Sequence, residues 1–354
     1  MSSSNVGYRQ PAARVLINGL PLAGIVRAEV TSNNYYSADC FKVELALGTT
    51  PPSISAFLAE ALEIEADVQL SLDGMDYTSL IIGQVDSIAF DPVIDRAIIS
   101  GRDYTATLIE AAVEESFNNR TASEVIEMLT QSNGFACVAT PTTTIIGRYY
   151  EDTYGISGLD QCSQFTTQWD LLVYLARQEG FDLFFSGRTL NFQPSGLSTR
   201  SMAVRPADCT ALRLKRSVVL SRDIELTIRS WNSRQHSAYT QLFLAANASG
   251  RAGQPVRYRM THPNLTAEQI TSLGFRKIAE LASYERSVEL EMPGELALTP
   301  RDFLAVAGSD TQFDQIYQIH SIRRCIHYRS GFKEAIRAVS ATPRSVTVTG
   351  AIPG

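Results

Sequence analysis

The sequence lacks any hydrophobic run long enough to cross a membrane. No stretch approaches the roughly 18 consecutive apolar residues that a spanning helix needs. Residues 1–10 are polar and do not contain the apolar core of a secretory signal. These absences argue against direct membrane insertion and predict a protein that is made and folded in the cytoplasm.

Cysteine and histidine are scarce and widely spaced. The five cysteines are odd in number, and the closest two, Cys137 and Cys162, are 25 residues apart. This spacing argues against a disulfide framework and a Cys-x-x-Cys metal site. The four histidines form no His-x-x-x-His pair, and the odd spacing of His320 and His327 would put them on opposite faces of a strand. We therefore expect no metal and no cofactor.

Basic charge is neither abundant nor clustered. The 31 Lys and Arg residues against 37 Asp and Glu give a net charge of -6, and only four of the basic residues are lysines. No stripe of basic residues interleaved with aromatic residues follows the chain, as it would in a protein that tracks a phosphate backbone. Sequence-specific binding of nucleic acid is therefore not expected.

Recognisable catalytic motifs are also missing. The chain has no Gly-x-Ser-x-Gly elbow, no P-loop and no Gly-x-Gly-x-x-Gly, so no motif indicates acyl transfer or nucleotide chemistry. Acidic residues such as Glu60, Glu63 and Glu65, or Glu289 and Glu291, could supply a glycosidase pair. The charged faces of ordinary helices and strands account for them better. The sequence predicts a protein that is not an enzyme.

The first hundred residues have the pattern of β-structure joined by tight turns. Asn18-Gly19 and Asp73-Gly74 favour the positive φ angles of type I′ hairpin turns, the first of them between residues 15–17 and 24–26. Residues 41–47 alternate between apolar and other side chains, which is typical of a strand with one buried face. Further strands are expected at residues 80–85 and 97–100.

From about Ala106 the pattern changes to α/β. Thr121 and Thr167 each begin a helix with a capping sequence, and Gly134 and Gly180 end those helices. The residues on both sides of Ser186-Gly187-Arg188 predict a short β-hairpin. The β-pattern returns from about residue 218, with alternating strands at residues 224–228 and 288–292 and one helix that begins at Thr266; the tail, residues 343–354, is expected to be loose.

The end of the first β-region resembles the end of the second. Residues 68–102 and residues 303–340 each contain an apolar strand, a polar turn, a longer strand and a closing strand, at nearly the same spacing. The long strands match as Val85-Asp86-Ser87-Ile88 against Ile319-His320-Ser321-Ile322. The sequence therefore favours an internal duplication over a coincidence of turn spacing.

Several motifs in a fixed order carry a resemblance to a known family. They are Ile17-Asn18-Gly19, Asp39-Cys40-Phe41-Lys42-Val43-Glu44, Gly83-Gln84-Val85-Asp86, Gly101-Arg102-Asp103-Tyr104-Thr105, Asn119-Arg120-Thr121, Trp169-Asp170-Leu171-Leu172 followed by Gly180-Phe181, and the Thr266 helix. In this order they resemble the phage tail and baseplate hub proteins, which include the late control protein D group, the Mu-like baseplate hubs and the hub part of type VI secretion spikes. The resemblance covers about residues 14–341.

The resemblance implies an α+β, mainly β fold with two similar tube-type β-barrel domains. An N-terminal arm, residues 1–13, would precede the first barrel at residues 14–105. An α/β insertion would follow at residues 106–217. The second barrel would occupy residues 218–341, with a helical insertion around residues 262–285, and residues 342–354 would form the tail.

The resemblance also implies a structural role in virion assembly and genome delivery. Three copies would close a ring with pseudo-sixfold symmetry that adapts a hexameric tail tube to a trimeric spike or tip. The expected partners are the tail tube protein, a separate spike or tip protein, distal tail or other baseplate proteins and the tape-measure protein, with DNA passing through the lumen. The location would be the tail or baseplate of the virion, after synthesis in the host cytoplasm.

The family motifs supply candidate interface residues, and no catalytic, cofactor or metal residues. In the Gly101 to Thr105 stretch, which closes the first barrel, Arg102 and Asp103 are candidates for an ion pair and Tyr104 for packing at the domain border. Because an unpaired strand edge can pair with a neighbouring subunit, residues 41–47 are expected to make a subunit contact. The full set of candidates is Asp39, Phe41, Val43, Gly83, Asp86, Gly101, Arg102, Asp103, Tyr104 and Trp169.

Two other functions remain open from the sequence. One is a tail-tip component that degrades cell wall or binds carbohydrate, since such domains accompany tail tips. The other is a monomeric, β-rich binding module with no role in a ring, which the oligomeric mass would distinguish from a hub.

Overall fold

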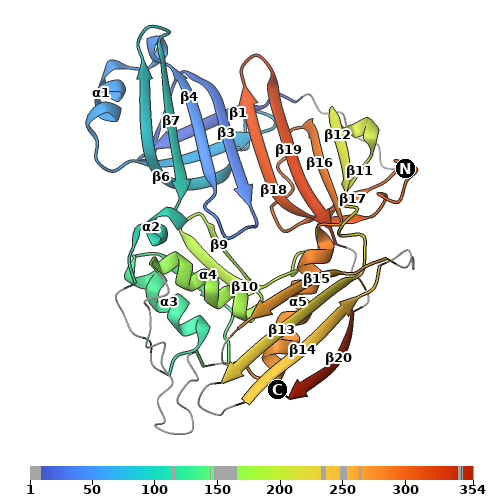
Figure 1. Cartoon of the computed structure of the whole chain (residues 1–354). Helices are drawn as coiled ribbons and strands as arrows, with labels where there is room; N and C mark the ends of the chain where they lie inside the picture. The colour runs from blue at the N-terminus through green and yellow to red at the C-terminus, as the bar shows by residue number, and fades with distance from the viewer. Residues whose placement is uncertain are drawn as a thin grey trace. The chain divides into compact units, whose positions relative to one another are not determined.

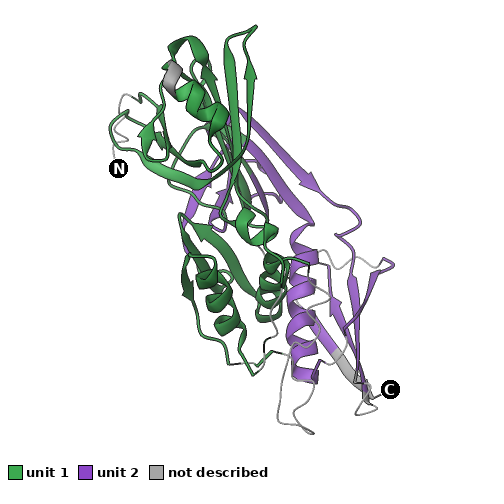
Figure 2. Cartoon of the chain, turned by 90° about the vertical axis from the view of Figure 1, so that its left-hand side faces the viewer, with its two compact units in different colours: residues 1–197, 291–300, 320–336 green, residues 198–290, 301–319, 337–354 purple. Residues whose placement is uncertain are grey.

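The computed structural model describes residues 9–113, 117, 119–143, 145–146, 166–232, 237–247, 253–262, 265–341, 344 and 346–353. Strands greatly outnumber helices, which confirms the expected α+β, mainly β class (Figure 1). None of the helices in these ranges is long and apolar enough to cross a membrane. The chain divides into two compact units, which Figure 2 colours separately: Met1–Leu197, Glu291–Pro300 and His320–Ile336 form unit 1, and Ser198–Leu290, Arg301–Ile319 and Arg337–Gly354 form unit 2.

The first unit contains an antiparallel sheet made mostly of the N-terminal strands. Its strands are hydrogen-bonded in the order β3-β4-β7-β6-β5-β1-β2, and residues 321–327 of β18 pair with the outer edge of β3. The elements are β1 (Ala12–Ile17), β2 (Leu20–Pro21), β3 (Ile25–Asn33), β4 (Cys40–Ala46), η1 (Leu47–Thr49), α1 (Pro52–Glu60), β5 (Glu65–Ser71), β6 (Thr78–Asp91), β7 (Arg96–Asp103) and β18 (Ile316–His327).

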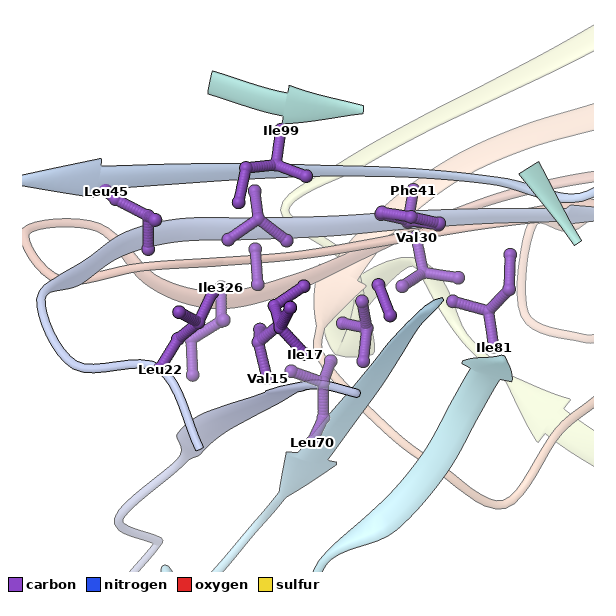
Figure 3. Close-up of a cluster of buried hydrophobic side chains, with 14 of the residues drawn as sticks. Val15, Ile17, Leu22, Val30, Phe41, Leu45, Leu70, Ile81, Ile99 and Ile326 are labelled. Atoms are coloured by element: carbon purple, nitrogen blue, oxygen red, sulfur yellow. The ribbon is translucent and has the colours of Figure 1, made fainter. Parts of the chain in front are cut away.

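Alternation along the strands builds the core of this sheet. In β4 the side chains of Phe41, Val43 and Leu45 are buried, while the residues between them are not. Figure 3 shows how Phe41 and Leu45 and the side chains of the facing strands, including Val15 and Leu70, point toward one another. Burying each such side chain stabilises the fold by about 1.5–3 kcal/mol. The strand expected at residues 41–47 is therefore confirmed as β4, although Leu47 belongs to η1.

An α/β region continues the first unit. It contains α2 (Thr105–Glu110), α3 (Ala122–Ser132), α4 (Gln168–Glu179) and a three-stranded sheet in the order β8-β10-β9, with β8 (Ala136–Ala139), β9 (Phe181–Ser186) and β10 (Thr189–Pro194). Thr121 and Glu124 form the expected reciprocal capping box, and Thr167 accepts a hydrogen bond from the amide of Asp170. Gly180 ends α4 with a φ of 74°, which glycine adopts without strain.

The second unit contains a separate four-stranded sheet, in the order β15-β13-β14-β20, against which α5 packs. The elements are β13 (Ile224–Asn232), β14 (Ser237–Ala245), β15 (Val256–Thr261), α5 (Ala267–Ser283) and β20 (Val346–Pro353). The capping box at Thr266 is present as predicted, with Gln269 as its second member. Ile224, Leu226 and Ile228 are fully buried between the sheet and the helix.

The remaining strands of the C-terminal half pair in the order β12-β16-β19-β18, with β17 paired to β18 and β11 paired to β17. They are β11 (Ser201–Val204), β12 (Ala211–Arg216), β16 (Arg286–Pro293), β17 (Phe303–Val306) and β19 (Gly331–Ser340), and η4 (Pro206–Asp208) connects β11 to β12. The boundary between the units runs through β16, β18 and β19.

Two hairpin turns differ in detail from the sequence expectation. Asn18 and Gly19 have the predicted positive φ angles of 47° and 81°, but the returning strand is the two-residue β2 and not residues 24–26. The loop at Asp73 is longer than a two-residue turn, because the Asp73 carboxylate accepts hydrogen bonds from the amides of Met75 and Asp76. A side chain that satisfies backbone amides stabilises a wider loop than the dipeptide alone predicts.

Three segments belong to other parts of the fold than the sequence suggested. The strand at residues 224–228 lies in the separate sheet with α5, whereas β11 and β12, expected in the α/β insertion, pair with β17 and β16. The tail was expected to be loose, but β20 pairs with β14, and Val346 and Val348 pack against the core of that sheet. Alternation identifies a strand, but it does not identify the strand that it pairs with.

The two sets of strands follow the same order. The first set, β3-β4-β7-β6-β5-β1, matches the second set, β12-β16-β19-β18-β17-β11, strand for strand, including the hairpins that the sequence comparison had aligned. The sets differ at one end, since β1 is antiparallel to β5 while β11 is parallel to β17. Within the described residues the sheets are open in their hydrogen bonding, so closure into two barrels stays a prediction.

Candidate functional site

Most of the candidate residues lie where the end of β7 pairs with the middle of β6 and with the start of β4. A register shift between Val85 and Ser87 leaves Asp86 as an extra residue in β6, a β-bulge. A Cβ atom on Gly83 would lie 1.9 Å from the carbonyl oxygen of Arg102, and one on Gly101 would lie 2.1 Å from that of Gln84. Both positions therefore require glycine, because the two backbones approach too closely for a side chain.

Phe41 and Val43 stabilise this corner from the adjacent strand. Phe41 is the cross-strand partner of Gly101, and its ring fills the space that a side chain there would take. β4 pairs with β3 on one side and with β7 on the other, so it is an interior strand. The prediction that residues 41–47 form an exposed edge for subunit contact was therefore wrong, because burial alternates in the same way in edge and interior strands.

Arg102 and Asp103 point to different environments and do not form the ion pair that their adjacency suggested. Arg102 donates two hydrogen bonds to the Asp86 carboxylate, at 2.7 and 2.8 Å, and a third to Glu110 at 2.8 Å. These bonds raise the pKa of the guanidinium. Adjacent residues of a strand face opposite sides of the sheet, so Asp103 is directed inward while Arg102 stays at the surface.

Asp103 is a buried carboxyl group, with only 6% of its surface exposed. It accepts a hydrogen bond of 3.1 Å from the amide of Thr105, at the start of α2. Its backbone amide donates to the carbonyl of Asp39 at 3.0 Å. Burial, and secondly the negative charge of Asp39, raise the pKa of Asp103 to about 7.

Tyr104 connects the sheet to the α/β region of the same unit. Its hydroxyl donates to the carboxylate of Glu65 on β5, which also binds Arg188 from the β9–β10 turn. Its ring packs against Phe135 at 4.8 Å between centroids. Tyr104 therefore has the packing role that the sequence predicted, with a polar connection in addition.

Trp169, on α4, makes the second connection. Its indole nitrogen donates a 2.7 Å hydrogen bond to the carbonyl of Tyr36, in the loop between β3 and β4. The side chain is buried in the same apolar cluster as Leu172 and Phe192. A buried tryptophan needs a partner for its single donor, and the loop supplies it.

The arrangement offers little room or chemistry for a substrate. A pocket lined by Asp39, Asp103, Tyr36 and Trp169, among others, has about 10 Å³ of free volume, which is about what one water molecule needs. No group of three or more metal-ligating side chains occurs in the described part of the chain. The acidic residues weighed as a glycosidase pair include Glu65, which binds Tyr104 and Arg188, and Glu289, which binds Lys215 at 2.7 Å.

Among the described strands of the two matched sets, β6 and β12 each have an edge that is open to a partner, whereas β4 does not. On the side of β6 away from β7, β5 pairs only as far as Gln84, so no strand of the described chain covers residues 87–91 there. Likewise β12 pairs with β16 on one side and with no described strand on the other. An open edge presents unpaired amide and carbonyl groups, which another chain can satisfy.

Several residues of the corner could not be found from sequence. Tyr36, Glu65, Glu110 and Arg188 bind candidate residues, yet the sequence pointed only to Glu65, as an acidic residue, and to Arg188, as part of a turn. Sequence distance explains this, because Tyr36 and Trp169 are 133 residues apart in the chain and Glu65 and Arg188 are 123 apart. The two consecutive tyrosines in a polar loop, Tyr35 and Tyr36, were the only visible signal.

Comparison with known proteins identifies the fold. No family model and no curated protein matches the sequence. Among solved structures, a tail protein from Neisseria meningitidis MC58 matches with a TM-score of 0.70 at 11% identity, covering 94% of this chain and 97% of the other. The 43 kDa tail protein of prophage MuSo2 from Shewanella oneidensis matches with a TM-score of 0.67 at 16% identity, covering 94% and 98%.

A third match comes from a secretion system. A component of the Escherichia coli type VI secretion system, described as structurally similar to tail proteins of bacteriophage T4, has a TM-score of 0.58 at 11% identity and covers 95% of this chain and 79% of its own. The chain therefore has the fold that phage tail proteins share with this secretion component.

Proposed function

We propose that this protein is a structural hub of a phage-type tail. Three copies close a ring that adapts a sixfold tail tube to a threefold spike or tip. The fold supports a tail role, since it matches tail proteins along almost their whole length. The main observation in support of the ring is the pairing of β3 with β18, considered together with the two matched sets of strands.

β3 and β18 join the first strand set to the second. Residues 27–33 of β3 pair antiparallel with residues 321–327 of β18. By their places in the strand order, β12 is the equivalent of β3, and β6 is the equivalent of β18. The corresponding pairing would join β12 to β6, and these are the strands with an open edge. The described chain does not contain this pairing, so a neighbouring copy is its natural source.

Repeating this contact around an axis would close a ring. A contact between two different surfaces generates a ring when its rotation closes. Because each chain supplies two strand sets, three chains would present six near-equivalent units, each resembling the barrel-type tube domain that the sequence comparison implied. The ring could then meet a sixfold tube on one side and a threefold spike on the other.

Charge on the two open edges supports their association. β12 carries Arg213, Lys215 and Arg216. The open part of β6, residues 87–91, has Asp91 at its end and follows directly after Asp86. Oppositely charged residues on adjacent strands stabilise pairing by about 0.2–1 kcal/mol each. Much of this charge is already neutralised within the chain, because Arg102 binds Asp86, Lys215 binds Glu289 and Arg216 binds Glu285. Backbone hydrogen bonds would therefore provide most of the affinity.

In this proposal the protein acts in the virion tail or baseplate and is not a catalyst. Its partners would be the tube protein, a separate spike or tip protein, distal tail or baseplate proteins and the tape-measure protein, with DNA passing through the ring. It would be made in the host cytoplasm before assembly.

Proline substitution at neighbouring residues of β6 tests the ring. Successive amides of a strand point to opposite sides, so of Ile88 and Ala89 one donates toward β7 and the other faces the open edge. Proline at the edge-facing position should leave a folded monomer and abolish the trimer, whereas proline at the other should disrupt the sheet. Native mass spectrometry and circular dichroism measure both effects.

A matched control uses the edge of the separate sheet. Proline at Arg257 and at Tyr258 of β15 tests an edge that has no part in the proposed ring, and the edge-facing variant should keep the trimer mass. A wild-type protein that stays monomeric at high concentration, both alone and with a spike protein, would refute the hub.

A further inference from the structure

The pairing of β3 with β18 joins two apolar faces as well as two backbones. Ala28 of β3 is the cross-strand partner of Ile326 of β18, and both side chains are buried. Ile326 and Phe332, from the β18–β19 hairpin, lie in the same apolar cluster as the side chains of the N-terminal strands (Figure 3). Within unit 1, this hairpin therefore completes the core of the first strand set.

The β6–β7 hairpin has the same place in its own strand set, but its core face is partly uncovered. Phe90 of β6 is the cross-strand partner of Ala97 of β7, which is fully buried. Cross-strand partners point to the same face of a sheet, so Phe90 points to the core face. Ile88, two residues earlier, packs against the core, but 39% of Phe90 is exposed.

The turn that follows Phe90 is apolar and is attached to the sheet. Val93 and Ile94 are 92% and 58% exposed. The carboxylate of Asp95 accepts a hydrogen bond from the amide of Gly48 at 2.8 Å, and its carbonyl accepts one from the amide of Leu47 at 2.9 Å. These bonds hold the turn against η1 while its two apolar side chains stay exposed. The hairpin therefore presents an apolar strip from Phe90 to Ile94.

β12 has a matching apolar face that is also partly uncovered. Lys215 binds Glu289 of β16 at 2.7 Å, so both side chains lie on one face of the sheet. Leu212 and Leu214 alternate with the basic residues of β12, and they therefore lie on the opposite face, where Leu290 of β16 is buried. Leu212 and Leu214 themselves are only half-buried. The corresponding residues of β3, in contrast, are covered by β18.

We propose that the apolar faces of β6 and β12 join between neighbouring copies of this chain, as those of β18 and β3 join within it. Phe90 of one copy packs against Leu212 and Leu214 of the next, so that the core of one strand set continues into the other. A second copy is the occupant because the chain's own hairpin already covers the equivalent face of β3. This contact rests on the proposed ring and adds an apolar part to its backbone pairing.

Phe90→Ser tests the apolar contact. Because Phe90 is already partly exposed in a single chain, the variant should keep its circular dichroism spectrum. The dissociation constant of each subunit contact, measured by sedimentation at several concentrations, should rise by about tenfold or more, since the burial of an aromatic side chain is lost. Phe275→Ser on α5 is the matched control, because this phenylalanine is 41% exposed, and it should leave the dissociation constant unchanged.

A charge exchange tests which residues meet. Phe90→Lys and Leu214→Lys should each weaken the trimer. Phe90→Lys combined with Leu214→Glu should bind more tightly than Phe90→Lys combined with Leu214→Lys, because opposite charges attract across the contact and like charges repel. The same two combinations at Leu212 cover a shift in the strand register.

The outcomes separate this contact from the ring itself. If the wild-type chain forms a trimer and Phe90→Ser leaves its dissociation constant unchanged, the apolar contact is wrong and the ring stands. The same conclusion follows if Phe275→Ser weakens the trimer equally, or if opposite charges restore binding at neither leucine. A wild-type chain that stays monomeric would overturn the ring and this contact together.

Discussion

The two strand sets share one order but stabilise their hairpins by different means. At the β6–β7 corner of the first set, two glycines allow close backbone contact, and the charged groups of Arg102 and Asp86 remain partly exposed. In the β18–β19 hairpin of the second set, Arg324 and Glu334 form an ion pair at 2.9 Å whose side chains are 6% and 0% exposed. The strand order therefore does not specify how a hairpin is stabilised.

The sets also differ in what their loops contain. β3 and β4 are joined by the short loop of residues 34–39, whereas the equivalent strands β12 and β16 are separated by the whole β13–β15 and α5 segment. A sheet keeps its hydrogen bonds whatever the loop length, and closing a longer loop costs only slowly increasing entropy. An insertion at this point thus leaves the strand order intact.

The largest effect should come from breaking the buried ion pair of the second set. Arg324 also donates to the carbonyl oxygens of Glu295, at 2.8 Å, and Leu298, at 2.6 Å. Glu334→Leu removes its carboxylate partner and should lower the free energy of unfolding by about 3–5 kcal/mol. Urea denaturation measures this. The double variant Arg324→Met with Glu334→Leu should recover much of the loss, and equal losses would show that no buried charge is involved.

Asp103 of the first set should make the stability depend on pH, as should Glu334 of the second set, since burial raises the pKa of both carboxyl groups. The pKa of Asp103 is about 7 in the folded protein against an ordinary value of 3.8, so the folded state keeps a proton that the unfolded state releases. Stability should therefore fall as the pH rises from about 4 to about 7 and level off above that, by about 4 kcal/mol in total. Denaturant midpoints at several pH values measure the slope, and in Asp103→Asn this contribution should vanish.

Close packing at the corner should give a smaller loss. Gly101→Ala places a methyl group against the carbonyl of Gln84 and the ring of Phe41, and it should cost about 1–3 kcal/mol. The matched control is Gly253→Ala, where a Cβ atom meets nothing within 4 Å. If the melting temperature fell by the same amount in both variants, close packing at the corner would have no special role in stability.

The smallest effects should be the same in both units. Thr121 caps α3 in unit 1 and Thr266 caps α5 in unit 2, each in a reciprocal capping box. Changing either residue to Ala should cost about 1 kcal/mol, and the double variant should show the sum. Chemical denaturation of the three variants checks this, and a strongly unequal pair would show that one helix depends on its cap more than on its packing.

The sequence predicted those parts of the fold that depend on near neighbours. The caps at Thr121 and Thr266, the stop at Gly180 and the strand at residues 41–47 each depend on residues a few positions apart. The strand β20 was missed although Val346 and Val348 alternate with threonines, because nothing near it in the sequence shows that it pairs with β14.

The candidate site was found only in part for the same reason. Gly83, Gly101, Phe41 and Asp103 meet at one corner, although they belong to three separate motifs. Their roles were not visible, since the bulge that aims Asp86 at Arg102 depends on how β6 and β7 are aligned.

Local sequence thus determined where helices and strands begin and end, because capping, alternation and turn conformation involve groups within about one or two turns of chain. Tertiary structure alone decided which strands became interior and which kept an open edge. It alone buried Asp103 beside Asp39 and set Tyr36 against Trp169, 133 residues away. Hydrogen-bond partners and burial are properties of the packed chain, so residues distant in sequence acquire them together, when the sheets form.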